Sequence, residues 1–346
     1  MAKTPLKFID LFAGIGGFRM AFQSQGYECV FSSEISKACQ EVYSKNFGYM
    51  PQGDIAKISP KSIPDFNVLL AGFPCQPFSI SGKKMGFKDT RGTLFFNICK
   101  IIKIKKPEYV VLENVKHLLH HDGGKTIQVI QNSLEELGYK SNFKILNAKD
   151  FGVPQNRERI VIIASKSGYF NFQSLRHSKP TNLRDFLDEG VSGFLDDTEY
   201  TILEEFNMQD SGLIFAGYRN KNIWKKGIRP NTKHLSRVHR QPNRIYSIDG
   251  VHPTIPSQET SGRFFIFIPE ERKVRKLTIN ECYRIMGFPA SFKKTANLSD
   301  AYRQIGNSVC VPMFAEVACQ MKNPENFLKH EPQRNPHKIL QLGLFD

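Results

Sequence analysis

The sequence predicts an α/β fold with a doubly wound, mostly parallel sheet, and a second, smaller domain that is irregular and rich in β-structure. Three observations support this prediction. Over about the first 165 residues, short apolar runs alternate with amphipathic stretches, as strands and helices do in parallel sheets. After that, loop-forming residues and scattered aromatic residues replace the alternation. Helical periodicity then returns near residue 277.

The alternating part is expected to contain strands separated by helices. We expect strands at Lys7–Leu11, Glu28–Ser32, Val68–Ala71, Tyr109–Glu113 and Ile160–Ala164. We expect helices at Phe18–Gln25, Ser36–Asn46, Leu94–Ile104 and Thr126–Leu137. Ligands of such sheets bind beyond the carboxyl ends of the strands. Nearly every unusual residue in this part of the chain stands at one of those ends.

The later part of the chain contains a basic segment and two further expected helices. Residues Arg219–Arg244 include nine Lys or Arg and no Asp or Glu. A helix is expected at Leu277–Met286, where Thr278 and Glu281 have capping-box spacing. Another is expected at Met313–Met321. We predict that residues 1–180 and 300–325 form the larger domain, 181–299 the smaller domain with its hinge, and 326–346 a flexible polar tail.

Composition and charge narrow the class of protein. The chain has 48 Lys and Arg against 33 Asp and Glu, a net charge of +15, which favours a polyanionic partner, nucleic acid first and an anionic membrane surface second. No apolar run approaches the 20 or so residues of a spanning helix, and the start of the chain lacks a signal-peptide pattern. We therefore expect no membrane insertion and a cytoplasmic protein. The seven cysteines include no C-x-x-C pair, so reduced thiols are expected, without a metal site.

A glycine-rich turn follows the first expected strand. In "FIDLFAGIGGF" (8–18), Gly14, Gly16 and Gly17 would let a ligand approach the backbone closely. Glu34 closes the next strand, where a carboxylate suits a pair of ribose hydroxyls. Arg19 occupies the place of the third glycine in G-x-G-x-x-G, which favours a nucleoside cofactor without a pyrophosphate. The alternative is a tight turn that binds nothing.

Cys75 stands between two prolines in "GFPCQPFS" (72–79), at the end of an apolar run. A rigid frame favours a nucleophile whose sulfur must be held in place, and the alternative is a buried structural thiol. The following stretch, 79–93, has three glycines and four basic residues. This composition predicts a lid that closes over a polyanion.

Two further motifs place charged groups at strand ends. Glu113 ends the apolar strand "YVVLENV", where a carboxyl group is costly to bury unless it is used. A functional Glu113 would hydrogen-bond a substrate and shuttle a proton. In "QNRERI" (155–160), Arg157 and Arg159 stand two residues apart and share a face. They would anchor a base oxygen or a phosphate, and surface salt bridges are the alternative.

Five motifs occur in one order along the chain: Asp-Leu-Phe-Ala-Gly-x-Gly-Gly, Pro-Cys-Gln, Glu-Asn-Val, Gln-x-Arg-x-Arg and Gly-Asn-Ser-Val. With them, the chain resembles the DNA (cytosine-5)-methyltransferases of the small bacterial restriction–modification type, over about 1–165 and 275–320. The resemblance implies the S-adenosylmethionine-dependent methyltransferase fold and a β-rich target-recognition domain. It implies duplex DNA as substrate, S-adenosylmethionine as cofactor and S-adenosylhomocysteine as product.

The resemblance also implies a covalent mechanism. The thiolate of Cys75 would add to C6 of a cytosine flipped out of the duplex. Glu113 would hold N3 and the N4 amino group, Arg159 would reach O2, and Arg157 would steady the closed loop. C5 would then take the methyl group, a base would remove its proton, and the thiolate would leave.

Binding residues are implied by the same resemblance. The cofactor set is Phe12, Gly14, Gly16, Glu34, Asp54, Phe73, Leu94, Asn307 and Val309, with Glu34 on the ribose and Asp54 near the adenine amino group. Relatives often have an aromatic residue where this chain has Ile35, so one adenine contact differs. The DNA set is Ser79, Ser81, Lys83, Arg91, Arg240, Gln241, Arg244 and Thr254. Within it, Gln241 would fill the gap left by the flipped base, Thr254 would touch phosphate, and Arg240 and Arg244 would contact phosphate or guanine.

The C-terminal "QLGLF" (Gln341–Phe345) is similar to peptides that dock on bacterial sliding clamps, and the alternative is a tail that folds back on the catalytic domain. A cognate restriction endonuclease is a second expected functional partner. The resemblance also implies a bacterial, nucleoid-associated protein, and we expect it to act as a monomer.

Other functions were weighed against these motifs. Cytosine-C5 methylation of tRNA uses the same chemistry, and the long basic segment favours DNA over it. A catalytically silent DNA-binding protein would not need Cys75, Glu113 and Arg159 together. An NAD-dependent dehydrogenase leaves Cys75, the arginine pair and the net charge unexplained. Amino-methylating enzymes normally have a Pro-Pro-aromatic motif, and the chain has no Pro-Pro.

Overall fold

The structure is a computed structural model that describes residues 4–74, 94–220, 239, 241–258 and 264–332. Several predicted functional residues lie outside this range: Cys75, Ser79, Ser81, Lys83, Arg91, Arg240 and the segment Gln341–Phe345. Most of the basic segment Arg219–Arg244 lies outside it as well. The predicted roles of these residues stay predictions.

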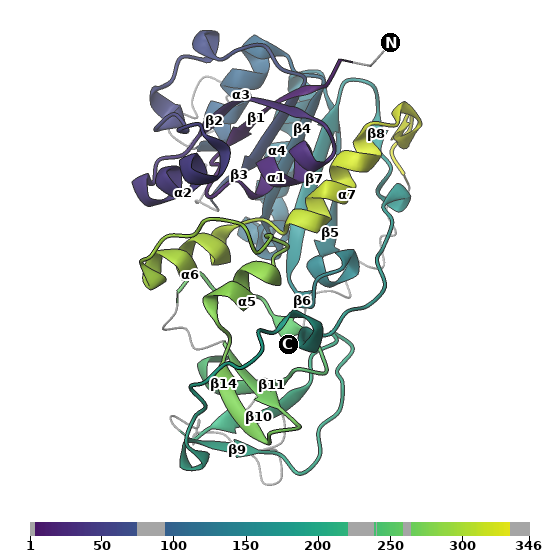
Figure 1. Ribbon diagram of the computed structural model, residues 1–346. Coiled ribbons are helices and arrows are strands. Elements are labelled where there is room, and N and C mark those ends of the chain that lie inside the picture. The colour runs from purple at the N-terminus through teal and green to yellow at the C-terminus, as the bar shows by residue number, and fades with distance from the viewer. Residues whose placement is uncertain (1–3, 75–93, 221–238, 240, 259–263, 333–346) are drawn as a thin grey trace.

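A six-stranded sheet forms the centre of the larger part of the molecule (Figure 1). Its strands, in spatial order, are β2 (Glu28–Ser33), β1 (Lys7–Leu11), β3 (Val68–Gly72), β4 (Tyr109–Val115), β7 (Glu158–Ser165) and β5 (Lys140–Asn147). The first four are parallel, and β7 runs antiparallel to both its neighbours. The sheet is therefore mixed but mostly parallel, as the sequence predicts, and β5 is a strand that the sequence did not reveal.

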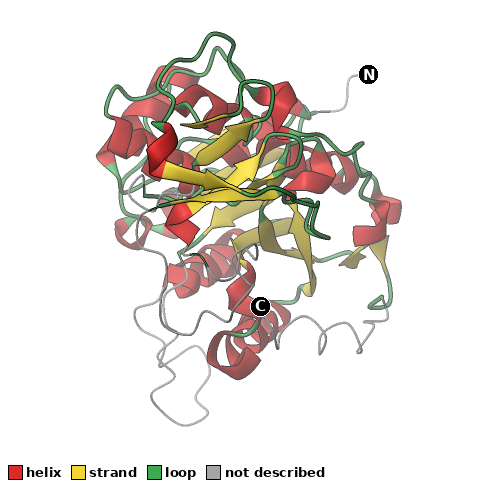
Figure 2. Cartoon of the chain, turned by 90° about the horizontal axis from the view of Figure 1, so that it is seen from below, coloured by secondary structure: helices red, strands yellow, loops and turns green. Residues whose placement is uncertain are grey.

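Helices cover both faces of this sheet, as Figure 2 shows. On one face, α1 (Gly17–Ser24) and α7 (Val311–Met321) pack against alternate strand residues such as Phe8 and Val111. On the other, α3 (Leu94–Lys105) and α4 (Lys125–Glu136) pack against the intervening ones, such as Ile9 and Leu112. Strands buried on both faces read as continuous apolar runs, which explains why most of them were predictable. The helix α2 (Lys37–Phe47) follows β2 in the chain.

A second sheet lies below the first in Figure 1. Its order is β14 (Lys273–Lys276), β13 (Phe265–Ile268), β11 (Arg244–Ser247), β10 (Phe215–Arg219) and β9 (Tyr200–Ile202). The pairs are antiparallel except β11 with β13. Its strands enclose a small core that includes Phe265, Phe267 and Val274. The β-rich structure predicted for this part of the chain is present.

Two short elements join the sheets. The strand β12 (His252–Pro253) pairs in parallel with β6 (Gln155–Asn156), just before β7. The chain then returns to the first sheet through α5 (Ile279–Arg284) and α6 (Leu298–Asn307). The capping box at Thr278 is present, because its hydroxyl accepts from the Glu281 N–H (3.1 Å) and its own N–H donates to Glu281 Oε2 (2.7 Å). The helix after it is shorter than expected.

The segment from residue 326, expected to be flexible, begins with ordered structure. The strand β15 (Phe327–Leu328) pairs antiparallel with β8 (Tyr169–Phe170). Burial of the Phe327 ring against Tyr109 and Phe170 explains this order.

None of the helices in the described ranges is long and apolar enough to cross a membrane. Within the same ranges, no group of three or more His, Cys, Asp or Glu side chains is arranged to hold a metal ion.

Candidate active site and cofactor pocket

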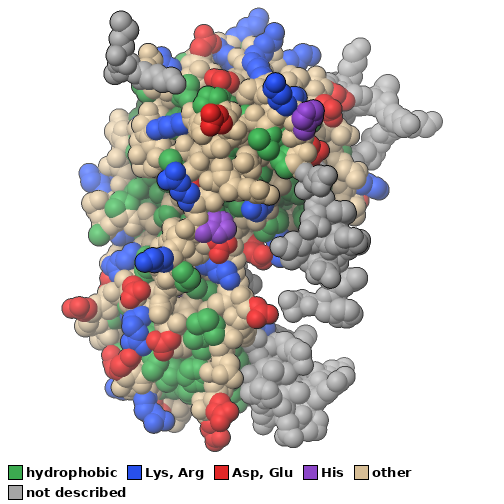
Figure 3. All heavy atoms as spheres, turned by 90° about the vertical axis from the view of Figure 1, so that its right-hand side faces the viewer, with side chains coloured by type: hydrophobic (Ala, Val, Ile, Leu, Met, Phe, Trp, Pro, Cys, Tyr) green, Lys and Arg blue, Asp and Glu red, His purple; other side chains and the backbone are tan. Residues whose placement is uncertain are grey.

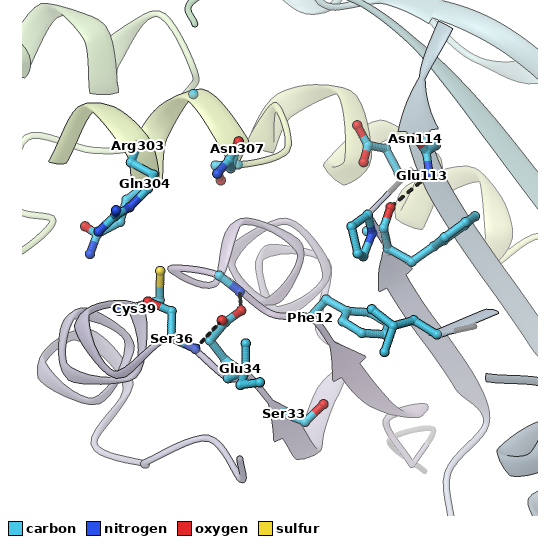
Figure 4. Close-up of a pocket in the computed structure, with 18 of the residues that line it drawn as sticks. Phe12, Ser33, Glu34, Ser36, Cys39, Glu113, Asn114, Arg303, Gln304 and Asn307 are labelled. Atoms are coloured by element: carbon cyan, nitrogen blue, oxygen red, sulfur yellow. Dashed lines mark hydrogen bonds between the residues drawn. The ribbon is translucent and has the colours of Figure 1, made fainter. Parts of the chain in front are cut away.

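A cavity of about 510 Å³ opens at the carboxyl ends of the parallel strands, where the sequence predicts the ligand site (Figure 4). Residues at or just after the carboxyl ends of β1, β2, β3 and β4 line it, together with the arginines before and in β7 and the end of α6. Seven of the nine predicted cofactor residues are in its lining: Phe12, Gly14, Glu34, Asp54, Phe73, Leu94 and Asn307. Three of the predicted catalytic residues are there too: Glu113, Arg157 and Arg159.

The glycine-rich turn serves two purposes. Gly14 lines the cavity, and a Cβ added to it would meet no atom within 4 Å. Gly16 and Val309 do not line the cavity. A Cβ on Gly16 would lie 2.3 Å from the Phe47 ring, and one on Gly17 would lie 2.9 Å from Val309 Cγ2. These two glycines are therefore required by packing within the protein, whereas Gly14 borders the ligand space.

Glu34 is fixed at the cavity wall by the backbone. Its Oε2 accepts a hydrogen bond from the Gly14 N–H (2.8 Å) and its Oε1 accepts one from the Ser36 N–H (2.7 Å) (Figure 4). Each carboxylate oxygen retains a further lone pair. The carboxylate is thus held rigidly and can still accept hydrogen bonds from two neighbouring hydroxyl groups.

The remaining walls of the cavity suit a nucleoside. Asp54 and the apolar side chains of Phe12, Ile55 and Leu94 contribute to the lining. Asp54 Oδ1 also accepts from the Ala56 N–H (2.9 Å), which fixes its position. Carboxylates for hydroxyl and amino groups, with apolar surface for a ring, fit a nucleoside cofactor. Ile35, at the position where relatives often have an aromatic residue, borders the cavity with 72% of its surface exposed.

At the other end of the cavity, Glu113 and Arg159 form a buried ion pair. Arg159 Nε lies 3.1 Å from Glu113 Oε1, and both side chains are about nine-tenths buried, with relative exposures of 12% and 11%. The antiparallel pairing of β4 and β7 brings them together, because Val115 lies opposite Arg159. Burial raises the pKa of Glu113, and Arg159 and Arg157 offset part of this rise. A carboxyl group with a raised pKa can hold a proton and donate it to a substrate nitrogen.

Asn114 has a positioning role that sequence reasoning missed. Its Nδ2 donates to the Phe73 carbonyl (2.8 Å), and its Oδ1 accepts from the Val115 N–H. It thereby ties the end of β4 to the backbone that leads into Pro74, which also lines the cavity. Cys75 is the next residue in the chain. The only sequence signal for this tie was the Glu-Asn-Val motif itself.

Arg157 is almost completely buried, with 1% of its surface exposed. Its Nη2 donates to the carbonyls of Gly306 (3.0 Å) and Ser308 (2.7 Å). The guanidinium therefore holds the turn at the end of α6, which also borders the cavity. The catalytic loop that the resemblance assigns to it lies outside the described residues, so that role stays a prediction.

Asp10 is a second residue that the sequence did not single out. Its carboxylate is fully buried beside the glycine-rich turn, and neither oxygen has a hydrogen-bond partner among the described residues. Burial raises the pKa of Asp10 to about 8, and Arg19 lowers it in part. Its strand neighbour Leu11 pairs with Ser33, which lines the cavity.

The three described residues of the predicted DNA set lie at the second sheet and its junction with the first, and they are not among the residues that line the cavity. Thr254 Oγ1 donates to the Asn156 carbonyl (2.8 Å), next to the β6–β12 pair. Arg244 Nε donates to the His239 carbonyl (3.0 Å). Gln241 begins a short 3₁₀ turn. On the face of the molecule in Figure 3, basic and acidic side chains are interspersed over both parts of the described surface.

Comparison with known proteins gives the family. A family model described as C-5 cytosine-specific DNA methylase matches residues 6–323. The protein belongs to this family. As a member it is a DNA (cytosine-5)-methyltransferase, and the predicted enzyme class and family are confirmed. The dehydrogenase alternative is set aside by the same finding.

Two curated relatives are similar to this methyltransferase over nearly their whole length. It is 42% identical over 331 residues to the type II methyltransferase M.HhaI of Haemophilus parahaemolyticus, covering 94% of this chain and 96% of that protein. It is 40% identical over 345 residues to the type II methyltransferase M.HaeII of Haemophilus aegyptius, covering 98% and 99%. These names support the restriction–modification type.

Solved structures show the same fold at lower identity. The Dnmt2 methyltransferase of S. pombe matches with a TM-score of 0.66 and 21% identity, over 93% of this chain and all of that one. A putative DNA modification methyltransferase encoded within an E. coli prophage matches with a TM-score of 0.64 and 19% identity, over 93% and 99%. The mixed sheet with helices on both faces is thus the fold of these methyltransferases.

Proposed function

We propose that this methyltransferase transfers a methyl group from S-adenosylmethionine to C5 of a flipped-out cytosine within a short, specific sequence of duplex DNA. The observation that carries the proposal is the buried Glu113–Arg159 pair at one end of a cavity whose other walls fit a nucleoside. The Phe73 carbonyl, just before Pro74, accepts a hydrogen bond from Asn114, the neighbour of Glu113, and both Phe73 and Pro74 line the cavity.

The cofactor would be held by residues whose positions are fixed by hydrogen bonds to the backbone. Glu34 would accept hydrogen bonds from the two ribose hydroxyls, because the backbone already orients both of its oxygens. Asp54 would accept from the adenine amino group, and Phe12 and Leu94 would provide apolar surface for the ring. When bound, S-adenosylmethionine supplies an electrophilic methyl group and leaves as S-adenosylhomocysteine.

The protein's own residues would make cytosine C5 nucleophilic. The thiolate of Cys75 adds to C6, forming an S–C6 bond and moving the electron pair of the C5–C6 double bond to C5. A protonated Glu113 donates to N3 and stabilises the negative charge that develops in the ring. Arg159, held by Glu113, donates to O2. After C5 has taken the methyl group, a base removes the C5 proton, the double bond re-forms, and the S–C6 bond breaks to release the thiolate.

The substrate base must leave the duplex, because a stacked cytosine exposes neither C6 nor its Watson–Crick edge to these groups. The second sheet and the basic segment Arg219–Arg244 form the proposed target-recognition region. Two observations support this assignment. The segment contains nine basic residues and no acidic ones, and the whole chain has a net charge of +15. Both favour contacts with DNA phosphates.

Labelled methyl transfer tests the proposal. Purified protein is incubated with methyl-labelled S-adenosylmethionine and either duplex DNA from a host without cytosine methylation or unmodified tRNA. We expect label in the DNA alone, recovered after hydrolysis as 5-methylcytosine. Label in tRNA alone would show that the substrate is RNA and not DNA. Label in neither nucleic acid would contradict the proposed reaction.

A further inference from the structure

The proposed cofactor cavity has a thiol in its wall. Cys39 belongs to the first turn of α2 and lines the cavity together with Glu34 and Ser36. The Cys39 N–H donates to the Ser36 hydroxyl oxygen (3.4 Å), and the Ser36 N–H donates to Glu34 Oε1 (2.7 Å). Cys39 is thus linked through Ser36 to the carboxylate that is proposed to hold the ribose. Among the described cysteines, Cys39 alone lines the cavity.

Side chains of α6 lie on the other side of this thiol. Gln304 Nε2 donates to the Ala38 carbonyl (2.9 Å), so α6 contacts α2 just before Cys39. In Figure 4 the Cys39 sulfur points toward Arg303 and Gln304, which also line the cavity. Gln304 has 4% of its surface exposed, and its Oε1 has no hydrogen-bond partner among the described residues. A buried acceptor without a partner is unfavourable, so this end of the cavity favours a polar ligand beside the thiol.

The surroundings of Cys39 set the reactivity of its thiol. Burial raises the pKa of Cys39 to about 11, the hydrogen bond with Ser36 and the charge of Arg303 lower it, and the charges of Glu34 and Asp300 raise it. The thiolate is the reactive form of a cysteine. Cys39 should therefore react slowly at neutral pH and faster as the pH rises. Its side chain is only half-buried, so a small reagent in the cavity can reach it.

We propose that Cys39 is a modification site at which a small disulfide compound blocks the cofactor cavity. The Cys39 thiolate attacks one sulfur of that compound, and a new S–S bond to Cys39 forms as the original S–S bond breaks. The other half of the compound leaves as a thiolate and takes up a proton. An excess of a small thiol reverses the exchange in the same way.

The group attached to Cys39 would occupy space beside Glu34 that the cofactor requires. The inference rests on the proposed use of S-adenosylmethionine as the cofactor. A purely structural alternative is that Cys39 only fills space between α2 and α6.

Three variants separate these possibilities. All contain Cys75→Ser, so that the predicted nucleophile cannot react, and two of them add Cys39→Ala or Cys29→Ala. Cys29 is the matched control, because it is also half-buried and burial raises its pKa to about 11 as well. Cys29 does not line the cavity. Thermal unfolding and the affinity for S-adenosylhomocysteine before treatment verify that each variant is folded.

Each variant is treated with oxidised glutathione at mildly alkaline pH until its mass no longer changes. Mass spectrometry of its peptides locates the glutathione, and calorimetry measures the Kd for S-adenosylhomocysteine. For Cys75→Ser alone we expect glutathione on Cys39 and a Kd that rises at least about 10-fold. With Cys39→Ala added, the Kd should stay within about 2-fold of its untreated value.

The variant with Cys29→Ala should respond to treatment as Cys75→Ser alone does, because Cys39 is still present. Excess dithiothreitol should restore the original Kd. Saturating S-adenosylhomocysteine should slow the modification of Cys39 and leave that of Cys29 unchanged, because the ligand occupies the cavity that only Cys39 borders.

Three results would overturn the inference while leaving the proposed function intact. The first is an unchanged Kd in protein whose Cys39 carries glutathione. The second is an equal rise in Kd when Cys39→Ala is present, which would assign the effect to another thiol. The third is the absence of glutathione from Cys39 after treatment, which would show that the thiol is not reached from the cavity. If the untreated proteins do not bind S-adenosylhomocysteine, the proposed cofactor fails and the inference fails with it.

Discussion

At the scale of single residues, the site combines groups that lie far apart in the sequence. Glu113 and Arg159 are 46 positions apart in the numbering, yet neighbouring strands set them in a buried pair. Removing one partner of a buried ion pair strongly destabilises a protein, because the other charge is left buried and unpaired. Glu113 and Arg159 therefore depend on each other for their positions in the cavity. The sequence indicated both residues, since Glu113 ends one apolar run and Arg159 begins another. Their contact was not predicted, because it depends on the antiparallel pairing of β4 and β7.

Replacement of Cys75 is the first prediction at this scale. Cys75→Ser should lower kcat by at least about 1,000-fold, because a serine hydroxyl is far less ionised and less nucleophilic than a thiol. DNA binding should persist. The matched control is Cys319→Ser, which changes an exposed thiol in α7 and should leave kcat unchanged. Methylation of the target duplex by Cys75→Ser at a near-normal rate would contradict covalent catalysis.

The pH dependence of the reaction is the second prediction. Burial raises the pKa of Glu113, and the proposed donor is its protonated form. As the pH rises through this raised pKa, the protonated fraction falls, so kcat should decline on the alkaline side. Glu113→Gln cannot lose that proton.

For Glu113→Gln we expect kcat about 100-fold lower and the alkaline decline absent from its pH profile. The measurement is single-turnover methylation between mildly acidic and alkaline pH for both proteins. An identical alkaline decline in the variant would assign the titration to another group.

At the scale of elements, most of the first sheet was predictable and the rest was not, for physical reasons. The strands buried on both faces have uninterrupted apolar runs, whereas β5 is an edge strand with only partial burial and polar residues such as Lys140 and Lys144. The strands of the second sheet are short, and loops separate them, so their pairing depends on long-range contacts. The positioning roles of Asn114 and Arg157 also depend on backbone carbonyls of distant turns.

The junction between the sheets contains a buried ion pair that should stabilise the folded protein. Arg275 at the end of β14 donates both terminal nitrogens to Glu281 in α5, at 2.9 and 2.8 Å, and both side chains are almost fully buried. Glu281 Oε1 also accepts from the Asp188 N–H (2.8 Å), on the chain that enters the second sheet. The Glu281 carboxylate thus connects the segment that enters the second sheet with the segment that leaves that sheet.

Glu281→Ala should lower the free energy of unfolding by about 3–5 kcal/mol, because it leaves the Arg275 charge buried and unpaired. Urea unfolding measures the change. The matched control is Asp65→Ala, which removes a 96% exposed carboxylate from its pair with Lys105 and should have a far smaller effect. Equal effects in both variants would show that the buried pair does not stabilise the junction.

At the scale of the whole molecule, the two sheets have different proposed roles. The first sheet supplies the cavity and the proposed chemistry, and the second sheet with the basic segment supplies the proposed DNA contacts. Phosphate contacts release counterions, so DNA affinity should fall steeply as salt rises. The target sequence itself was not predictable, because base readout depends on side-chain placement in the recognition region.

Substitution of Lys225 and Lys226 in the basic segment tests whether this segment contacts DNA phosphates. Changing both to Ala should reduce the slope of log affinity against log salt by about 2, if each lysine contacts one phosphate. The control changes Lys105 and Lys106, at the opposite end of α3 from the cavity residue Leu94, and should leave the slope unchanged. Fluorescence anisotropy with a labelled duplex gives both slopes. Equal slopes in the wild type and the Lys225/Lys226 variant would place the phosphate contacts elsewhere.

Bisulfite sequencing of genomic DNA tests the central claim most directly. The gene is expressed in a bacterial host that lacks cytosine methylation, with Cys75→Ser expressed to the same soluble level as the control. The proposed function predicts protected cytosines confined to one short sequence in cells with the wild-type protein and none in cells with the variant. An unmethylated genome in cells that contain soluble wild-type protein would contradict it.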